Sequence, residues 1–149
     1  MENQNNLGIK TLQIIWTFLF LGTAPLIFLS YQASQAGAAE GDFEQMKLIF
    51  MAVAAVEFVL AWLLPKIICG QSIQALPSQR SMSQMIQASF VGWVIQFALF
   101  ESICLFGFIL VFVMTKQFND IFPFMVLSYL GFILRFPTED KIEKMCSKI

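Results

Sequence analysis

The sequence predicts an all-α integral membrane protein, a four-helix bundle formed by a single transmembrane domain over residues 1–149. Of its 149 residues, 58% are hydrophobic and only 13% are charged, and the mean hydropathy is +0.72. Soluble domains contain roughly 45–50% apolar and about 25% charged residues, so this chain is too apolar for that class. Four apolar stretches also reach the length of a membrane-crossing helix, which takes about 20 residues.

The expected spans follow these apolar stretches in order along the chain. They cover residues 11–31, 43–64, 89–115 and 118–136. Pro25 lies inside the first span, where neighbouring helices can satisfy the carbonyl that a proline leaves unpaired. Pro123 lies near the start of the fourth span and suits the first turn of a helix, because that position needs no backbone N–H.

Polar segments separate the spans. Residues 32–42 are small and polar, and residues 65–88 form a longer polar loop whose second half can be an interfacial helix. Residues 116–120 form a tight turn before the fourth span. The short charged tail, residues 137–149, contains a helix that Thr138 is expected to cap.

Basic residues predict the orientation, because cytoplasmic loops carry the excess of Lys and Arg. With four spans, Lys47 and Lys116 lie on one side of the membrane. The remaining basic residues lie on the other side: Lys10, Lys66, Arg80, Arg135, Lys141, Lys144 and Lys148. Both termini are therefore expected in the cytoplasm. An interfacial aromatic belt is expected at the cytoplasmic ends of the spans, at Trp16, Trp62 and Trp93.

Composition argues against several classes of function. The chain has no histidine, so the commonest metal ligand and the commonest general base are missing, and we expect no enzyme, no metal and no cofactor. Cys69, Cys104 and Cys146 form no CxxC pair, and we interpret them as thiols in the place of small apolar residues. The net charge of -1 and the lack of a dense basic cluster argue against nucleic acid as a partner.

Glu101 is the strongest candidate for a functional residue. It lies near the middle of the third span, where a charge costs about 2.5–3.5 kcal/mol on insertion scales. Its helical face carries the apolar side chains of Ala98, Cys104, Leu105 and Phe108, so we expect a neutral acid in the resting state. An acid at this depth indicates a proton or cation site. The alternative is a protonated carboxyl that hydrogen-bonds to another helix.

Glu57, in the second span, is the second candidate. Ala54 and Ala61 share its helical face, so another helix can approach closely there. Glu57 can share a site with Glu101, or it can hydrogen-bond between helices or reach the interface. Other polar residues inside the spans are expected to form helix-to-helix hydrogen bonds: Gln13, Thr17, Gln96 and Ser128.

Residues 76–113 carry a resemblance to a known family. A loop of sequence Leu-Pro-Ser-Gln-Arg ends at Arg80, and Glu101 follows in Ala-Leu-Phe-Glu-Ser-Ile-Cys-Leu-Phe-Gly, which ends at Gly107. This pattern resembles the second helix of the c subunits (proteolipids) of rotary ATP synthases. The resemblance implies a proton- or sodium-binding carboxylate at Glu101. Residues 51–61 depart from that family, because they carry alanines where it has a run of glycines.

The whole chain also resembles uncharacterised small four-helix bacterial inner-membrane proteins, through the spacing of Glu101 and Gly107 and through Phe136-Pro137-Thr138 after the last span. This resemblance implies a fold and the bacterial inner (plasma) membrane, but no activity. We therefore expect a homo-oligomer or a subunit of a membrane complex, with the lipid bilayer as its surroundings, that binds a proton or cation at Glu101. The alternative is a structural or assembly factor in which Glu57 and Glu101 only hold helices together.

Overall fold

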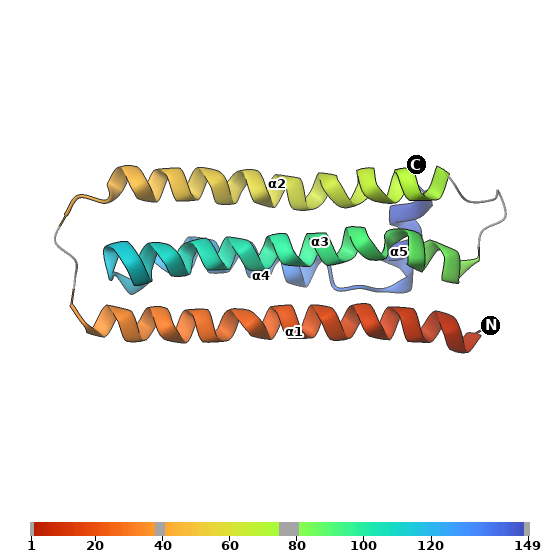
Figure 1. The fold of residues 1–149 in the computed structure, drawn as a ribbon, viewed down its shortest axis with the longest axis horizontal. Helices are drawn as coiled ribbons and strands as arrows, with labels where there is room; N and C mark the ends of the chain where they lie inside the picture. Colours follow the sequence, from red (N-terminus) through yellow and green to blue (C-terminus); the bar gives the residue numbers. More distant parts are fainter. Residues whose placement is uncertain (1, 38–40, 75–80, 148–149) are drawn as a thin grey trace.

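The computed structural model describes residues 2–37, 41–74 and 81–147, and all regular elements in these ranges are helical. Three long helices lie side by side, with α3 between the other two (Figure 1). They are α1 (Glu2–Gln35), α2 (Glu44–Gln74) and α3 (Met82–Ile109). The chain continues through a π-helical segment (Leu110–Thr115), a 3₁₀ turn (Phe118–Ile121), α4 (Phe122–Leu134) and α5 (Glu139–Ser147).

The long helices have the composition of membrane spans. Leu7–Gln35, Glu44–Ser72 and Met82–Thr115 are each long and apolar enough to cross a membrane, and Phe118–Leu134 is a shorter apolar helix. Large apolar side chains cover the outside of the bundle; Phe18 and Leu48, for example, are 74% and 70% exposed. An outer surface of this kind suits lipid rather than water, so the predicted all-helical membrane class is confirmed.

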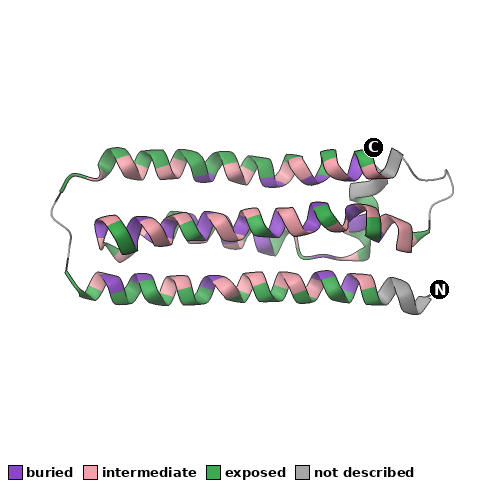
Figure 2. Ribbon diagram, in the orientation of Figure 1, coloured by how far each residue is buried: buried purple, intermediate pink, exposed green. Residues whose placement is uncertain are grey.

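α3 is the centre of the bundle. It packs against α1 and α2 on either side, and against α4 and α5. Figure 2 shows the result: buried residues run along α3, whereas exposed residues cover much of α1 and α2. An apolar helix with neighbours on several sides is buried almost all round, which explains why α3 shows no polar stripe.

Two glycines allow α4 to approach α3 closely. A Cβ atom built at Gly131 would lie 2.4 Å from ring carbons of Phe100, and one built at Gly107 would lie 2.7 Å from Cβ of Phe124. Small residues at these two positions are therefore required for the contact, as is usual where membrane helices pack. The aromatic rings on either side, Phe100 and Phe124, are almost fully buried.

The predicted loop over residues 65–88 is wrong in its first half, where α2 continues, whereas the helix expected in its second half is present as the start of α3. α2 continues through Pro65 to Gln74. α3 begins after Ser81, whose hydroxyl accepts the N–H of Gln84 while the Gln84 side chain accepts the N–H of Ser81. Hydropathy indicates where a segment stops being apolar. A helix can continue into polar residues and begin at a polar cap, so the two boundaries differ. Pro77 and Arg80, in the predicted loop, lie outside the described residues, as does Lys148 in the tail.

The end of α4 is closed by side chains from α1 and α5. Trp16 of α1 donates its Nε1–H to the carbonyl of Phe132, 2.9 Å away. Lys141 of α5 donates to the carbonyls of Leu134 and Phe136, at 3.0 and 3.2 Å. These carbonyls belong to the last turn of α4 and the residues after it, where a helix offers no partner of its own. The expected helix in the tail is confirmed, and it closes this end of the bundle.

Candidate functional site

Glu101 lies on α3 where α3 meets α1. A Cβ atom at Gly22 of α1 would lie 3.0 Å from Oε1 of Glu101, so the glycine leaves the space that the carboxyl group occupies. Glu101 is half-buried. On its helical face, Cys104 is fully buried and Leu105 is 40% exposed, so the carboxyl lies at the border between the bundle and its outer surface.

Glu101 accepts no hydrogen bond from any residue that the structure describes. Two polar side chains beside the site are directed elsewhere. Ser102, the next residue along α3, faces α2, and Thr23, the residue after Gly22 on α1, pairs with Tyr129 of α4 at 3.0 Å. A carboxylate at the border of an apolar bundle, without a donor, loses hydration that no described group replaces. The geometry therefore favours a neutral carboxyl or one that meets a partner from outside the chain.

Glu57 has a partner inside the chain. The hydroxyl of Ser102 donates to its Oε2 across 2.7 Å, and this bond links α2 to α3. The expectation that Ala54 and Ala61 admit a close helix is confirmed, because both are fully buried in the core cluster and α2 packs against α3. The sequence did not single out Ser102 as a partner of Glu57, although a polar residue directly after Glu101 inside an apolar span was a signal for such a bond.

The two acids therefore belong to different helix contacts. Glu101 faces α1 at Gly22, whereas the next residue, Ser102, faces α2 at Glu57. α3 lies between α1 and α2 (Figure 1). Within residues 2–37, 41–74 and 81–147, no group of three or more Cys, Asp and Glu side chains is placed to hold a metal ion.

Gln96 forms the helix-to-helix hydrogen bond expected of it. Its Nε2 donates to the carbonyl of Ala61 in α2, at 2.6 Å, in the buried core. Pro65 has no N–H, so the carbonyl four residues before it has no partner within α2. That carbonyl belongs to Ala61, and Gln96 therefore supplies the hydrogen bond that Pro65 prevents within α2.

The other polar residues divide into two groups. Gln13 donates to the carbonyl of Pro137 at 3.2 Å and so connects α1 to the segment before α5. For Thr17 the expectation is wrong, because its hydroxyl donates to the carbonyl of Gln13 in its own helix, at 2.8 Å. It is also wrong for Ser128, whose buried hydroxyl has no partner in the described part of the chain. The Thr17 hydroxyl is satisfied within its own helix, as Ser and Thr hydroxyls often are, and spacing alone does not reveal this.

The tryptophans do not form a uniform interfacial belt. Trp93 is fully buried, and its ring packs 5.6 Å from that of Phe97. The belt prediction is wrong for this residue, because α3 has helices around it and therefore buries its large side chains. Trp16 and Trp62 are partly exposed and lie towards the end of the bundle where α4 ends.

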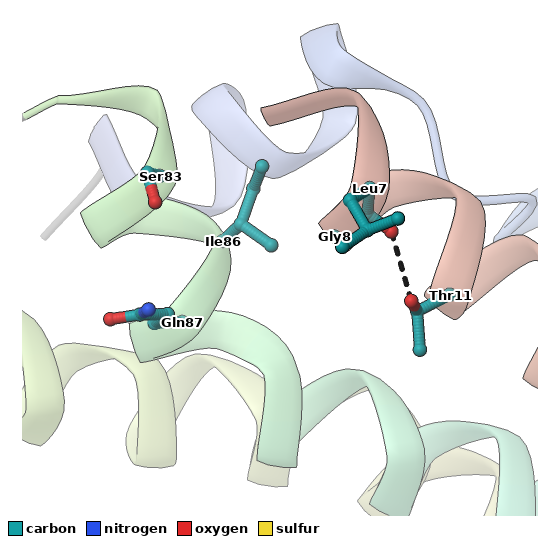
Figure 3. Close-up of a pocket in the computed structure, with 6 residues that line it drawn as sticks. All are labelled: Leu7, Gly8, Thr11, Ser83, Ile86 and Gln87. Atoms are coloured by element: carbon teal, nitrogen blue, oxygen red, sulfur yellow. Dashed lines mark hydrogen bonds between the residues drawn. The ribbon is translucent and has the colours of Figure 1, made fainter. Parts of the chain in front are cut away.

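A pocket of about 300 Å³ lies between the start of α1 and the start of α3 (Figure 3). Its walls include the hydroxyls of Thr11 and Ser83 and the amide of Gln87, but Thr11 already donates to the carbonyl of Leu7 at 2.9 Å. None of the described residues that line the pocket is acidic or basic. It is far along α1 and α3 from Gly22 and Glu101, so it is not part of the carboxyl site.

No protein-family model, curated protein or solved structure that was compared matches the chain. The fold and the site define a class: an all-helical protein with helices able to span a membrane, whose central helix carries a carboxyl group that receives no hydrogen bond from the described residues.

Proposed function

We propose that this chain is a non-enzymatic subunit of a membrane assembly that takes up and releases a proton at Glu101. The observation that carries the proposal is the setting of that carboxyl group. It lies against Gly22 at the border of the bundle, and none of the described side chains donates a hydrogen bond to it. Such a group is either protonated or covered by another molecule when the chain lies in lipid.

The chemistry at Glu101 favours a proton over a metal cation. Hard cations require several oxygen ligands; Ca²⁺, for example, takes about 6–8 of them. Ser102 is directed towards Glu57 on the opposite side of α3, and Thr23 is engaged with Tyr129. Glu101 thus offers one carboxylate without further oxygen ligands from its neighbours, which suffices for a proton.

The proposed topology has four spans with both ends in the cytoplasm. The segment Phe118–Leu134 is apolar. At about 1.5 Å per residue it is about 25 Å long, slightly less than the roughly 30 Å of a typical hydrocarbon core. Its close packing through Gly107 and Gly131 supports a span that lies inside the bundle, and local thinning of the bilayer can absorb the difference in length.

The distribution of basic residues supports this orientation. α4 runs towards the end of the bundle at which α1 begins and stops partway along it, level with Trp16 (Figure 1). The described basic residues on this half of the bundle are Lys10, Lys66, Arg135, Lys141 and Lys144. At the other end Lys47 forms ion pairs with Glu44 and Asp120, at 3.0 and 3.3 Å. Lysines and arginines are retained on the cytoplasmic side, so this end is the inner one. A bacterial inner membrane rests on the resemblance of the whole chain alone.

Labelling with a lipid-soluble carbodiimide tests the proton site, because this reagent reacts with protonated carboxyl groups. We expect wild-type protein to be labelled at Glu101, with labelling decreasing as the pH rises. Glu101→Gln removes the labelled carboxyl, and Glu57→Gln is the matched control, since it changes the other acid and leaves Glu101 in place. Labelling that is independent of pH, or that occurs equally in the Glu101→Gln variant, would contradict the proposal. Strong protection by sodium would instead favour a cation site.

A structural or assembly role is the second candidate, and the bond between Ser102 and Glu57 favours it. That bond joins two helices and leaves no acid free for transport at this position. The two roles predict different behaviour for Glu101→Gln. A structural role requires a changed oligomer size or the loss of a co-purifying partner, measured by light scattering in detergent. The proton site predicts an unchanged assembly together with the loss of the pH-dependent labelling.

A further inference from the structure

Arg135, directly after α4, lies on the ring of Trp62 in α2. Its guanidinium carbon is 4.1 Å from the centre of that ring, which is a cation–π contact. The contact holds the planar guanidinium group in one place and leaves its edges available for hydrogen bonds. Arg135 is partly buried, whereas Lys66, one helical turn after Trp62 on α2, is exposed.

Two N–H donors at this contact have no acceptor. Nε1 of Trp62 and Nε of Arg135 are both buried, and neither has a hydrogen-bond partner in the described ranges of the chain. Both groups can only donate, so they cannot satisfy one another. Unsatisfied buried donors are costly, and two on side chains in contact call for an acceptor beyond the described residues, which a bound ligand can supply.

The carbonyl groups near Arg135 do not supply that acceptor. Trp16 and Lys141 already donate to the carbonyls of Phe132, Leu134 and Phe136. No described carboxylate is paired with Arg135 either, because both ion pairs in the described residues involve Lys47 at the opposite end of the bundle. Arg135 therefore carries a positive charge without a counter-charge from the described side chains.

We propose that Arg135, Trp62 and Lys66 form a site for the phosphate group of a membrane lipid headgroup. The guanidinium fork matches the geometry of a phosphate group, which can also accept from the two orphaned N–H groups once a shift of the Arg135 side chain uncovers them. Lys66 supplies a second positive charge on the same helical face. The site lies at the level where α4 ends, which the proposed topology places at the boundary of the bilayer, where headgroups are found, and the partly apolar Trp62 suits that boundary. The inference rests on the chain lying in a membrane and is independent of proton binding at Glu101.

The test measures lipid binding to the purified full-length chain in detergent, by native mass spectrometry with short-chain phosphatidylglycerol. We expect Arg135→Gln to weaken binding by about tenfold or more, as is usual for the loss of a charge-assisted hydrogen bond. Trp62→Phe keeps the ring but removes the N–H, and a smaller loss is expected. Lys144→Gln, which removes an exposed lysine at the same end of the molecule, is the matched control and should bind as wild type does.

Three results would overturn the lipid site. The first is wild-type affinity in Arg135→Gln, provided that circular dichroism shows native helix content for that variant. The second is equal binding of a phosphate-free sugar lipid of the same chain length, which would show that the acyl chains alone are recognised. The third is displacement of the bound lipid by inorganic phosphate at a concentration as low as that at which added phosphatidylglycerol displaces it. That result would assign the site to a soluble phosphate compound. An unchanged affinity in Glu101→Gln is expected in every case.

Discussion

The side-chain amide of Gln96 donates a 2.6 Å hydrogen bond to the backbone carbonyl of Ala61 on the neighbouring helix. Both residues are fully buried. Pro65 creates the need for this bond, since the helix cannot supply an N–H at its position. A proline inside α2 and a glutamine inside α3 thus depend on each other, although each alone is unfavourable in an apolar span.

Gln96→Leu should destabilise the bundle, because it leaves the carbonyl of Ala61 buried without a donor. We expect a loss of about 1–3 kcal/mol in the free energy of unfolding, measured by denaturant titration in detergent. In a Pro65→Ala background the new N–H restores the bond within α2, so the same substitution should cost clearly less. Equal costs in the two backgrounds would show that Gln96 does not act through this carbonyl.

Ser102→Ala removes the hydrogen bond that joins α3 to Glu57 of α2. Polar bonds of this kind in membrane bundles contribute about 0.6 kcal/mol on average and up to roughly 1.7 kcal/mol, and we expect a loss in that range. Glu57→Gln should be better tolerated, since its side-chain oxygen still accepts from Ser102. A double-mutant cycle with Glu57→Ala measures the coupling, and additive effects would exclude a direct interaction.

Gly131→Ala should disturb the contact between α3 and α4. Its new Cβ would lie 2.4 Å from the ring of Phe100, which is fully buried and has no room to move aside. Overpacking of this kind costs about 1–3 kcal/mol, to be measured as a lower unfolding midpoint. Ile133→Ala is the control on the same helix, because Ile133 is 64% exposed and its change should have little effect.

Gly22→Ala should move the carboxyl group of Glu101 without unfolding the protein. The added Cβ would lie 3.0 Å from Oε1, the mobile tip of a side chain that can turn outward. We expect faster carbodiimide labelling of Glu101 with an unchanged unfolding midpoint. Ala24→Ser, on an exposed position of the same turn of α1, should leave the labelling rate unchanged. If Gly22→Ala had no effect on labelling, Gly22 would not shape the site.

The membrane class and the helical content could be predicted from the sequence, because both depend on the length and apolarity of continuous segments. The boundaries of the helices could not be predicted in the same way. α2 extends through Pro65 only because Gln96, from a distant part of the chain, satisfies the freed carbonyl. The capping box of Ser81 and Gln84, by contrast, is a local pattern that sequence reasoning could have recognised.

The depth of Glu101 in the membrane stays a prediction from its place in the third span, and its surroundings could not be predicted. Which helix lies beside it depends on how α1, α2 and α3 are ordered in space, and the spacing of spans carries no such information. The contact with Gly22 and the separation of Glu101 from Glu57 are therefore findings of the structure. Trp93 illustrates the same limit, since a tryptophan near a span end faces the lipid only if no neighbouring helix covers it.

The central position of α3 has a consequence for synthesis, because the chain is made from its N-terminus. α1 and α2 are made first, and yet each packs mainly on α3 rather than on the other. When they enter the bilayer they share no substantial interface, and the surfaces around Gly22 and Glu57 face lipid until the third helix arrives. Assembly therefore awaits the insertion of α3 between two helices that are already in place, so a chain cut between α2 and α3 should still be able to associate.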